Sequence, residues 1–126
     1  MKRILVIDDD IQVRQMLKQI LERAGYEVAD APDGKEGIRL YRDEPADLII
    51  TDIIMPEKEG IETILELRRE FPDVKIIAIS GGGRFDPGVY LDAAEKFGVA
   101  RTFGKPIDRK ELLDAIQELL GDVLVS

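Results

Sequence analysis

Polar residues interrupt the aliphatic runs of this sequence at four places where chemistry could occur. Three aspartates, Asp8 to Asp10, follow the first run, and Asp52 follows a later one. Ser80 ends another run, and Lys105 precedes a proline after an alternating segment. Each residue alone has a simpler interpretation, because Asp commonly caps helices or starts turns and Lys is commonly a solvated surface group. Only their combination indicates a reactive site.

A divalent cation is the natural partner for these carboxylates. Carboxylates that share a site repel one another unless a proton or a cation lies between them. The chain has no His and no Cys, so a metal would need oxygen ligands, which suits a hard cation. Mg²⁺ commonly takes one or two carboxylates together with a phosphate oxygen. The residue types therefore indicate magnesium-dependent phosphate chemistry.

The polar residues can meet only if a parallel sheet brings the ends of their strands together. Aliphatic runs start at 4, 48 and 76, and such runs are typical of strands covered on both faces. The alternating segments 26–30 and 99–103 are expected at the sheet edges. With helical patterns in every gap, this predicts an α/β fold: a (βα)5 doubly wound parallel sheet of strand order 2-1-3-4-5, flavodoxin-like. Ligands of such sheets bind beyond the carboxyl ends of the strands.

Capping residues and apolar spacing predict the helices. Asp10 is a candidate N-cap and Gly25 a candidate stop for the first helix, whereas Asp33 with Glu36 and Asp108 with Glu111 resemble capping boxes. A fourth helix is expected over about 89–97, after an Asp-Pro pair at 86–87. The expected buried stripes are Val13, Met16, Leu17, Ile20 and Leu21 in the first helix, Ile61, Ile64 and Leu65 in the third, and Leu112, Leu113, Ile116, Leu119 and Leu120 in the last.

Length and charge limit the class of protein. A chain of 126 residues is one domain long, so we expect a single domain over 1–126, in which residues from 121 could form a short linker. The net charge of −8 argues against direct binding to nucleic acid, whose backbone is also negative. No apolar run approaches the roughly 20 residues that span a bilayer. With no cysteine in the chain, the expected location is cytoplasmic.

The chain resembles bacterial two-component response-regulator receivers, including the chemotaxis regulators, from end to end. The matching pieces are the aliphatic run with its aspartates at 4–9, the Asp-Ile-Ile-Met-Pro element at 52–56 with Gly60 after it, Ser80, and Lys105 with its proline. The resemblance implies a switch rather than an enzyme. A sensor histidine kinase or a phosphotransfer protein would supply the phosphoryl group from a phosphohistidine. The output would be a downstream protein partner or a fused domain, and the chain could form a homodimer.

The resemblance also implies a role for each matched residue. Asp52 would accept the phosphoryl group, and Asp9 and Asp52 would bind Mg²⁺ directly. Ile54 would add its backbone carbonyl, and Asp8 would act through bound water. In this family a matched Lys pairs with the acceptor Asp and then with a phosphoryl oxygen, which implies that role for Lys105.

The same resemblance implies a cis bond between Lys105 and Pro106. It also implies that Ser80 donates a hydrogen bond to the phosphoryl group. Such a bond would pull on the glycine-rich loop 81–88, which we expect to transmit the signal. Many receivers carry an aromatic residue three positions before the lysine, but this chain has Thr102 there. Phe103, one residue later, should face the opposite way and belong to the core.

Two other functions remain open from the sequence. A receiver-like adaptor would keep the fold and act without phosphorylation. A magnesium-dependent phosphohydrolase of the haloacid-dehalogenase type would need an acid two residues after its nucleophile. That position is Ile54, which cannot protonate a leaving group.

We predict a long-lived phospho-Asp52, because neither Ile54 nor Gly82 has a polar side chain that could orient an attacking water. Ile54→Asn should then speed the loss of the phosphoryl group, measured by intact mass over time after the donor is removed. An unchanged rate in the variant would contradict this explanation.

Overall fold

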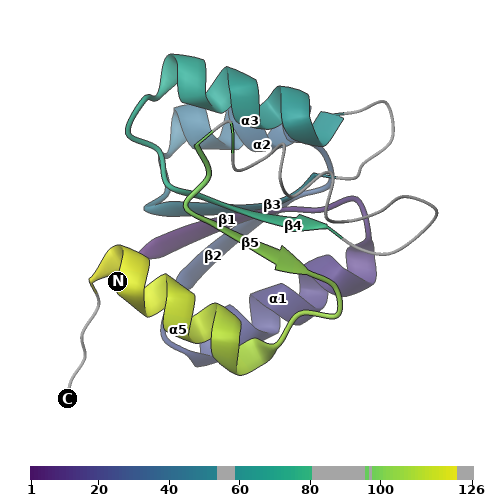
Figure 1. Ribbon diagram of the computed structural model, residues 1–126, viewed down its shortest axis with the longest axis vertical. Helices are drawn as coiled ribbons and strands as arrows, with labels where there is room; N and C mark the ends of the chain where they lie inside the picture. Colours follow the sequence, from purple (N-terminus) through teal and green to yellow (C-terminus); the bar gives the residue numbers. More distant parts are fainter. Residues whose placement is uncertain (54–58, 81–95, 97, 122–126) are drawn as a thin grey trace.

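The computed structural model describes residues 1–53, 59–80, 96 and 98–121, and Figure 1 shows them as one sheet between helices. Five parallel strands pair in the order β2-β1-β3-β4-β5, which confirms the predicted fold and strand order. The elements along the chain are β1 (Arg3–Ile7), α1 (Ile11–Arg23), β2 (Glu27–Ala31), α2 (Gly34–Asp43), β3 (Leu48–Asp52), α3 (Glu59–Glu70), β4 (Ile76–Ser80), β5 (Arg101–Gly104) and α5 (Arg109–Leu120).

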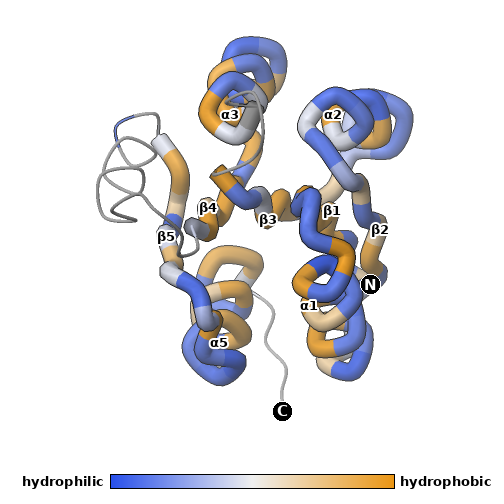
Figure 2. Tube along the Cα trace, turned by 90° about the vertical axis from the view of Figure 1, so that its right-hand side faces the viewer, coloured by the Kyte–Doolittle hydropathy of each residue, from blue (hydrophilic) through white to orange (hydrophobic). Residues whose placement is uncertain are grey.

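The core lies on both faces of the sheet. Figure 2 shows α2 and α3 over one face and α1 and α5 over the other. In β1, Leu5 and Ile7 pack into the cluster beneath α2 and α3, whereas Ile4 and Val6 pack into the cluster beneath α1 and α5. Successive strand residues point to opposite faces, so an unbroken aliphatic run buries every side chain. In the described ranges, no helix is long and apolar enough to cross a membrane.

The two alternating segments form the sheet edges, as predicted. β2 begins at Glu27 and β5 at Arg101, so each strand starts one or two residues later than its sequence pattern suggests. Side chains along both edges are only partly covered. Phe103 is partly buried and packs against the cluster beneath α1 and α5, which supports its predicted place in the core.

The predicted caps hold the helix ends. Asp10 accepts hydrogen bonds from the backbone N–H groups of the first turn of α1. Asp33 and Asp108 each accept one N–H bond from the residue three positions later, at 2.8 and 3.0 Å. Gly25 follows α1 with a φ of +99°, a conformation that glycine adopts without a steric cost.

Two residues of the predicted stripes are exposed, whereas the others are buried or partly buried. Met16 is 41% exposed and Leu65 is 40% exposed. A helix turns about 100° per residue, so a side chain next to a buried position can already face solvent. In α3 the fully buried residues that pack into the core cluster are Ile64, which belongs to the predicted stripe, and Leu67, which does not. Of the fourth helix expected over about 89–97, only residue 96 is described, and it is helical; the expected Asp-Pro cap lies outside the described residues.

Leu67→Ala should lower the free energy of unfolding by about 2–4 kcal/mol, because it leaves a cavity beside Ile64 in a closed core. Leu65→Ala is the matched control from the same helix, and it should cost less than about 1 kcal/mol. Urea unfolding of both variants measures the difference. Equal losses would show that the assignment of the buried face of α3 is wrong.

Candidate functional site

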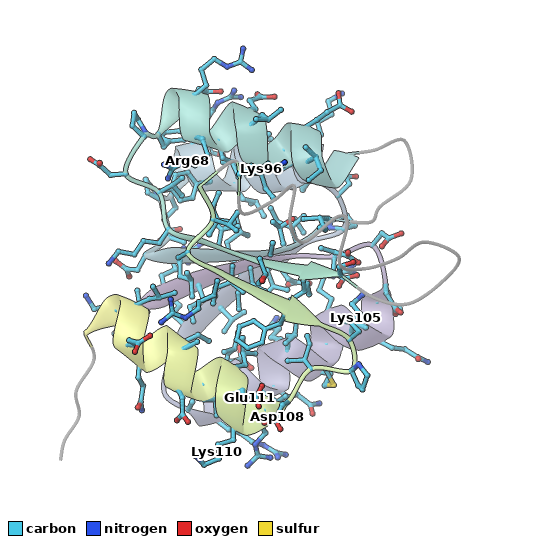
Figure 3. All side chains as sticks on the ribbon, in the orientation of Figure 1. Arg68, Lys96, Lys105, Asp108, Lys110 and Glu111 are labelled. Atoms are coloured by element: carbon cyan, nitrogen blue, oxygen red, sulfur yellow. The ribbon has the colours of Figure 1, made fainter. Side chains whose placement is uncertain are left out.

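The predicted site residues lie at the carboxyl ends of four neighbouring strands. Asp8 directly follows β1, Asp52 is the last residue of β3, and Ser80 is the last residue of β4. Lys105 lies just beyond the end of β5 (Figure 3). Its backbone N–H donates to the Ser80 carbonyl at 2.9 Å, so the ends of β4 and β5 meet at the same edge.

Three carboxylates converge at this edge. One oxygen each from Asp8, Asp9 and Asp52 lies within 4.8 Å of the other two. Asp8 is fully buried and Asp52 is 3% exposed, whereas Asp9 is open to solvent. Oxygen ligands at this spacing suit a hard divalent cation such as Mg²⁺.

Lys105 balances part of the negative charge. Its Nζ donates to Asp52 Oδ2 at 3.0 Å and lies 3.3 Å from Asp8 Oδ2. Burial alone would lower the pKa of Lys105, but the Asp52 and Asp8 carboxylates outweigh this effect and raise the pKa above its usual value. The side chain therefore stays in its charged ammonium form. Three carboxylates and one ammonium still leave a formal charge of −2 when all are ionised. A divalent cation would neutralise this charge.

Burial is the largest influence on Asp8 and raises the pKa of its carboxyl group. The hydrogen bond from the Asp10 N–H lowers the pKa again, the neighbouring charge of Asp52 raises it, and Lys105 lowers it. The net effect is a raised pKa. The ionised form of Asp8 is therefore held in the fold at a cost in free energy.

Two buried polar atoms at this edge lack a hydrogen bond to any described residue. They are Ser80 Oγ and Asp8 Oδ2, although the latter keeps its ion pair with Lys105. Buried polar groups are nearly always satisfied, so such atoms indicate a missing partner. A cation or its bound water would suit the carboxylate oxygen, and a phosphoryl oxygen would suit the hydroxyl group. The residues therefore fit both magnesium and phosphate.

A glycine lets α3 begin close to this edge. Gly60 packs on the backbone of Ile53, the residue after Asp52, and a Cβ at position 60 would lie 2.3 Å from Ile53 Cα. No side chain fits in that space. The bond between Lys105 and Pro106 is cis, as the family resemblance implied. Ile54, expected to contribute its carbonyl, lies outside the described residues.

Sequence reasoning missed Arg14, which reaches the site from α1. Its Nη1 donates to the Asp8 carbonyl at 2.9 Å, and its Nε donates to Asp30 Oδ2 at 2.8 Å. A signal was available, because Arg14 stands three residues before Leu17 and so shares the buried face of the helix. A cation on such a face needs partners.

Asp8→Asn should raise the thermal midpoint by a few degrees at neutral pH without metal, as a gain on the order of 1 kcal/mol would in a domain of this size. The variant removes a buried charge and can keep the hydrogen bond from the Asp10 N–H. Calorimetry measures the midpoint. Asp114→Asn, at an exposed helix position, is the control and should change little.

The pH dependence of this gain has a defined sign. Because the folded state raises the pKa of Asp8, the protonated form favours folding, and that contribution is lost as pH rises through the folded-state pKa. The advantage of the variant should therefore shrink as pH falls through that range. A lower midpoint for Asp8→Asn at neutral pH would contradict the assignment of a destabilising buried charge.

Comparison with known proteins agrees with this geometry. The sequence profile of the family described as "Response regulator receiver domain" matches residues 4–117. The chemotaxis protein CheY of Thermotoga maritima is 35% identical over 119 residues, which cover 94% of this chain and 97% of that protein. The DNA-binding transcriptional regulator NtrC of Azospirillum brasilense is 37% identical over 118 residues, 94% of this chain but only 24% of that protein.

Solved structures of receiver domains have the same fold as this chain. A response regulator receiver domain protein from Clostridium thermocellum superposes with a TM-score of 0.87 at 30% identity, over 96% of this chain and 95% of that one. The profile match covers most of the chain, and the relatives agree in sequence and in structure. The chain therefore belongs to the family of response-regulator receiver domains, the signalling modules of two-component systems.

Proposed function

We propose that this chain is a phospho-accepting switch that takes a phosphoryl group on Asp52 in a magnesium-dependent transfer. The donor is a phosphohistidine on a sensor histidine kinase or a phosphotransfer protein. The observation that carries this proposal is the buried Asp52 carboxylate, 3.0 Å from Lys105 Nζ and in one cluster with Asp8 and Asp9. A nucleophile, a counter-charge and a set of oxygen ligands thus share one strand edge.

In the proposed reaction an oxygen of Asp52 attacks phosphorus, and the bond from phosphorus to the donor nitrogen breaks. Phosphoryl transfer needs mostly positioning and compensation of charge. Lys105 is held near Asp52 by the end of β5, so its ammonium group can turn from the carboxylate to a phosphoryl oxygen. Ser80 Oγ, which has no hydrogen bond to the described residues, donates to another phosphoryl oxygen.

The metal ligands in this proposal are Asp9 and Asp52 directly, with Asp8 acting through water. The Ile54 carbonyl is a further ligand by family resemblance alone. When bound, Mg²⁺ offsets the negative charge of the carboxylates and of the incoming phosphoryl oxygens. Asp8 and Asp52 are buried and fixed by the sheet, so the chain itself orients two of the carboxylates.

The signal leaves the site through β4 in this proposal. A phosphoryl group adds negative charge and strong acceptor oxygens, and the hydroxyl of Ser80 bonds to it. Loop 81–88, which lies outside the described residues, and the helix expected after it would then change the surface that a partner binds. That partner is a downstream protein or a fused output domain, and a homodimer is a further assembly. We place this switch in the bacterial cytoplasm.

Intact mass spectrometry after incubation with acetyl phosphate tests the proposal. The wild type should gain one phosphoryl group with Mg²⁺ and none with a chelator. Asp52→Ala should gain none, whereas Asp114→Asn, which alters an exposed aspartate, should label like the wild type. Labelling of Asp52→Ala would refute Asp52 as the acceptor.

A phosphohistidine donor protein provides the second arm, because some receivers react poorly with small donors. Labelling by that protein alone would support the proposal and identify the donor class. If neither donor labels the wild type, the chain is a receiver-like adaptor that acts without phosphorylation. Steady release of inorganic phosphate, with turnover far above one per chain, would instead favour a phosphohydrolase.

A further inference from the structure

Arg14 joins the acidic site to the edge strand of the sheet. From α1 its guanidinium donates to the Asp8 carbonyl and to the Asp30 carboxylate, at 2.9 and 2.8 Å. The Arg14 side chain is only 13% exposed, and that of Asp30 is 22% exposed. Lys18, one turn later, lies 3.8 Å from the other Asp30 oxygen and makes no hydrogen bond to the described part of the site.

The Arg14 contact fixes the backbone between two of the carboxylates. On one side of Asp8, its N–H donates to the Ala31 carbonyl at 3.2 Å. On the other side, its carbonyl accepts from Arg14. Because a peptide group is planar, holding the Asp8 carbonyl also holds the nitrogen of Asp9 and directs the chain that carries its side chain.

Asp9 depends on this backbone for its position. Among the described residues, none donates a hydrogen bond to the exposed Asp9 carboxylate, whereas Asp8 receives one from the Asp10 N–H and faces Lys105. For an exposed carboxylate without such bonds, the backbone fixes the direction of the Cα–Cβ bond and so limits which positions the carboxylate can reach. The peptide plane held by Arg14 thus sets the point from which the Asp9 side chain can reach the other two carboxylates.

We propose that Arg14 is a positioning residue for cation binding, acting through the Asp8 carbonyl to aim the Asp9 carboxylate. This inference rests on the proposed function, in which the three carboxylates hold Mg²⁺. Groups that orient metal ligands commonly change metal affinity by about 10- to 100-fold when they are removed. Arg suits this task because its planar fork can serve two acceptors at fixed angles, which a single ammonium group cannot.

The sign of the effect separates positioning from simple electrostatics. A positive charge near the site repels a cation, so removal of charge alone should tighten Mg²⁺ binding. Loss of positioning should weaken it. The two explanations therefore predict opposite changes for Arg14→Gln, and only positioning predicts weaker binding for Arg14→Lys, which keeps the charge.

Isothermal titration calorimetry with MgCl₂ on the full chain tests the inference, well below the thermal midpoint of each variant. We expect the Kd to rise roughly tenfold in both Arg14→Lys and Arg14→Gln. Lys18→Gln is the matched control, because it removes a charge beside Asp30 but no contact with Asp8, and its Kd should stay the same or fall. A wild-type Kd in Arg14→Lys, or a lower Kd in Arg14→Gln, would overturn the proposal.

Asp30→Asn provides an independent test that keeps Arg14 in place. It weakens the anchor of the guanidinium, so Mg²⁺ binding should weaken, and Arg14→Gln with Asp30→Asn should bind no more weakly than Arg14→Gln alone. If the losses of Mg²⁺ affinity in the two single variants added fully in the double variant, Asp30 would not act through Arg14. If the wild type itself gives no binding heat and no magnesium-dependent phosphorylation, the proposed function fails with this inference. If the wild type binds and both Arg14 variants match it, only this inference fails.

Discussion

The structure of the site depends on holding the carboxylates of Asp8 and Asp52 close together while both are buried from solvent. Parallel strands bring their carboxyl ends to one edge, and β1 lies beside β3, so the two carboxylates become neighbours wherever the fold forms. Their repulsion must be offset by something within the fold. Lys105 forms ion pairs with both carboxylates from just beyond the end of β5, so the edge strand on that side of the sheet supplies the positive charge that the site needs.

Burying any one of these charged groups alone would cost free energy of folding, and the neighbouring opposite charges offset part of that cost. Burial raises the pKa of Asp8, whereas Lys105 would have a lowered pKa without the carboxylates that surround it. The apolar core on both faces of the sheet stabilises the fold and offsets the free-energy cost of burying these charges. The three central strands β1, β3 and β4 are therefore mostly apolar, and their acidic and hydroxyl residues lie at or just beyond their carboxyl ends.

The sequence predicted most of this because its signals were local or periodic. Aliphatic runs identified the three central strands, alternating segments identified the two edge strands, and the acid or hydroxyl residues that follow the aliphatic runs identified Asp8, Asp52 and Ser80. Helix caps were predictable from one residue and its third neighbour. Leu65 and Leu67 were misassigned because a short helix has several apolar residues, and the sheet selects the face that fits it. The position of Arg14 on the buried face of α1 could have been predicted from its spacing to Leu17, but its bond to the backbone carbonyl of Asp8 could not, because side-chain patterns do not record such contacts.

The uneven exposure of the three carboxylates has a consequence for timing. Asp8 and Asp52 are buried and Asp9 faces solvent, so in the described part of the structure an ion can reach the cluster without any opening of the core. If the cluster holds Mg²⁺ as proposed, the ion can exchange with the surroundings quickly while its inner ligands stay in place. The duration of a signal would then be governed by the lifetime of the acyl phosphate bond, and the supply of the ion would determine only whether the receiver is ready.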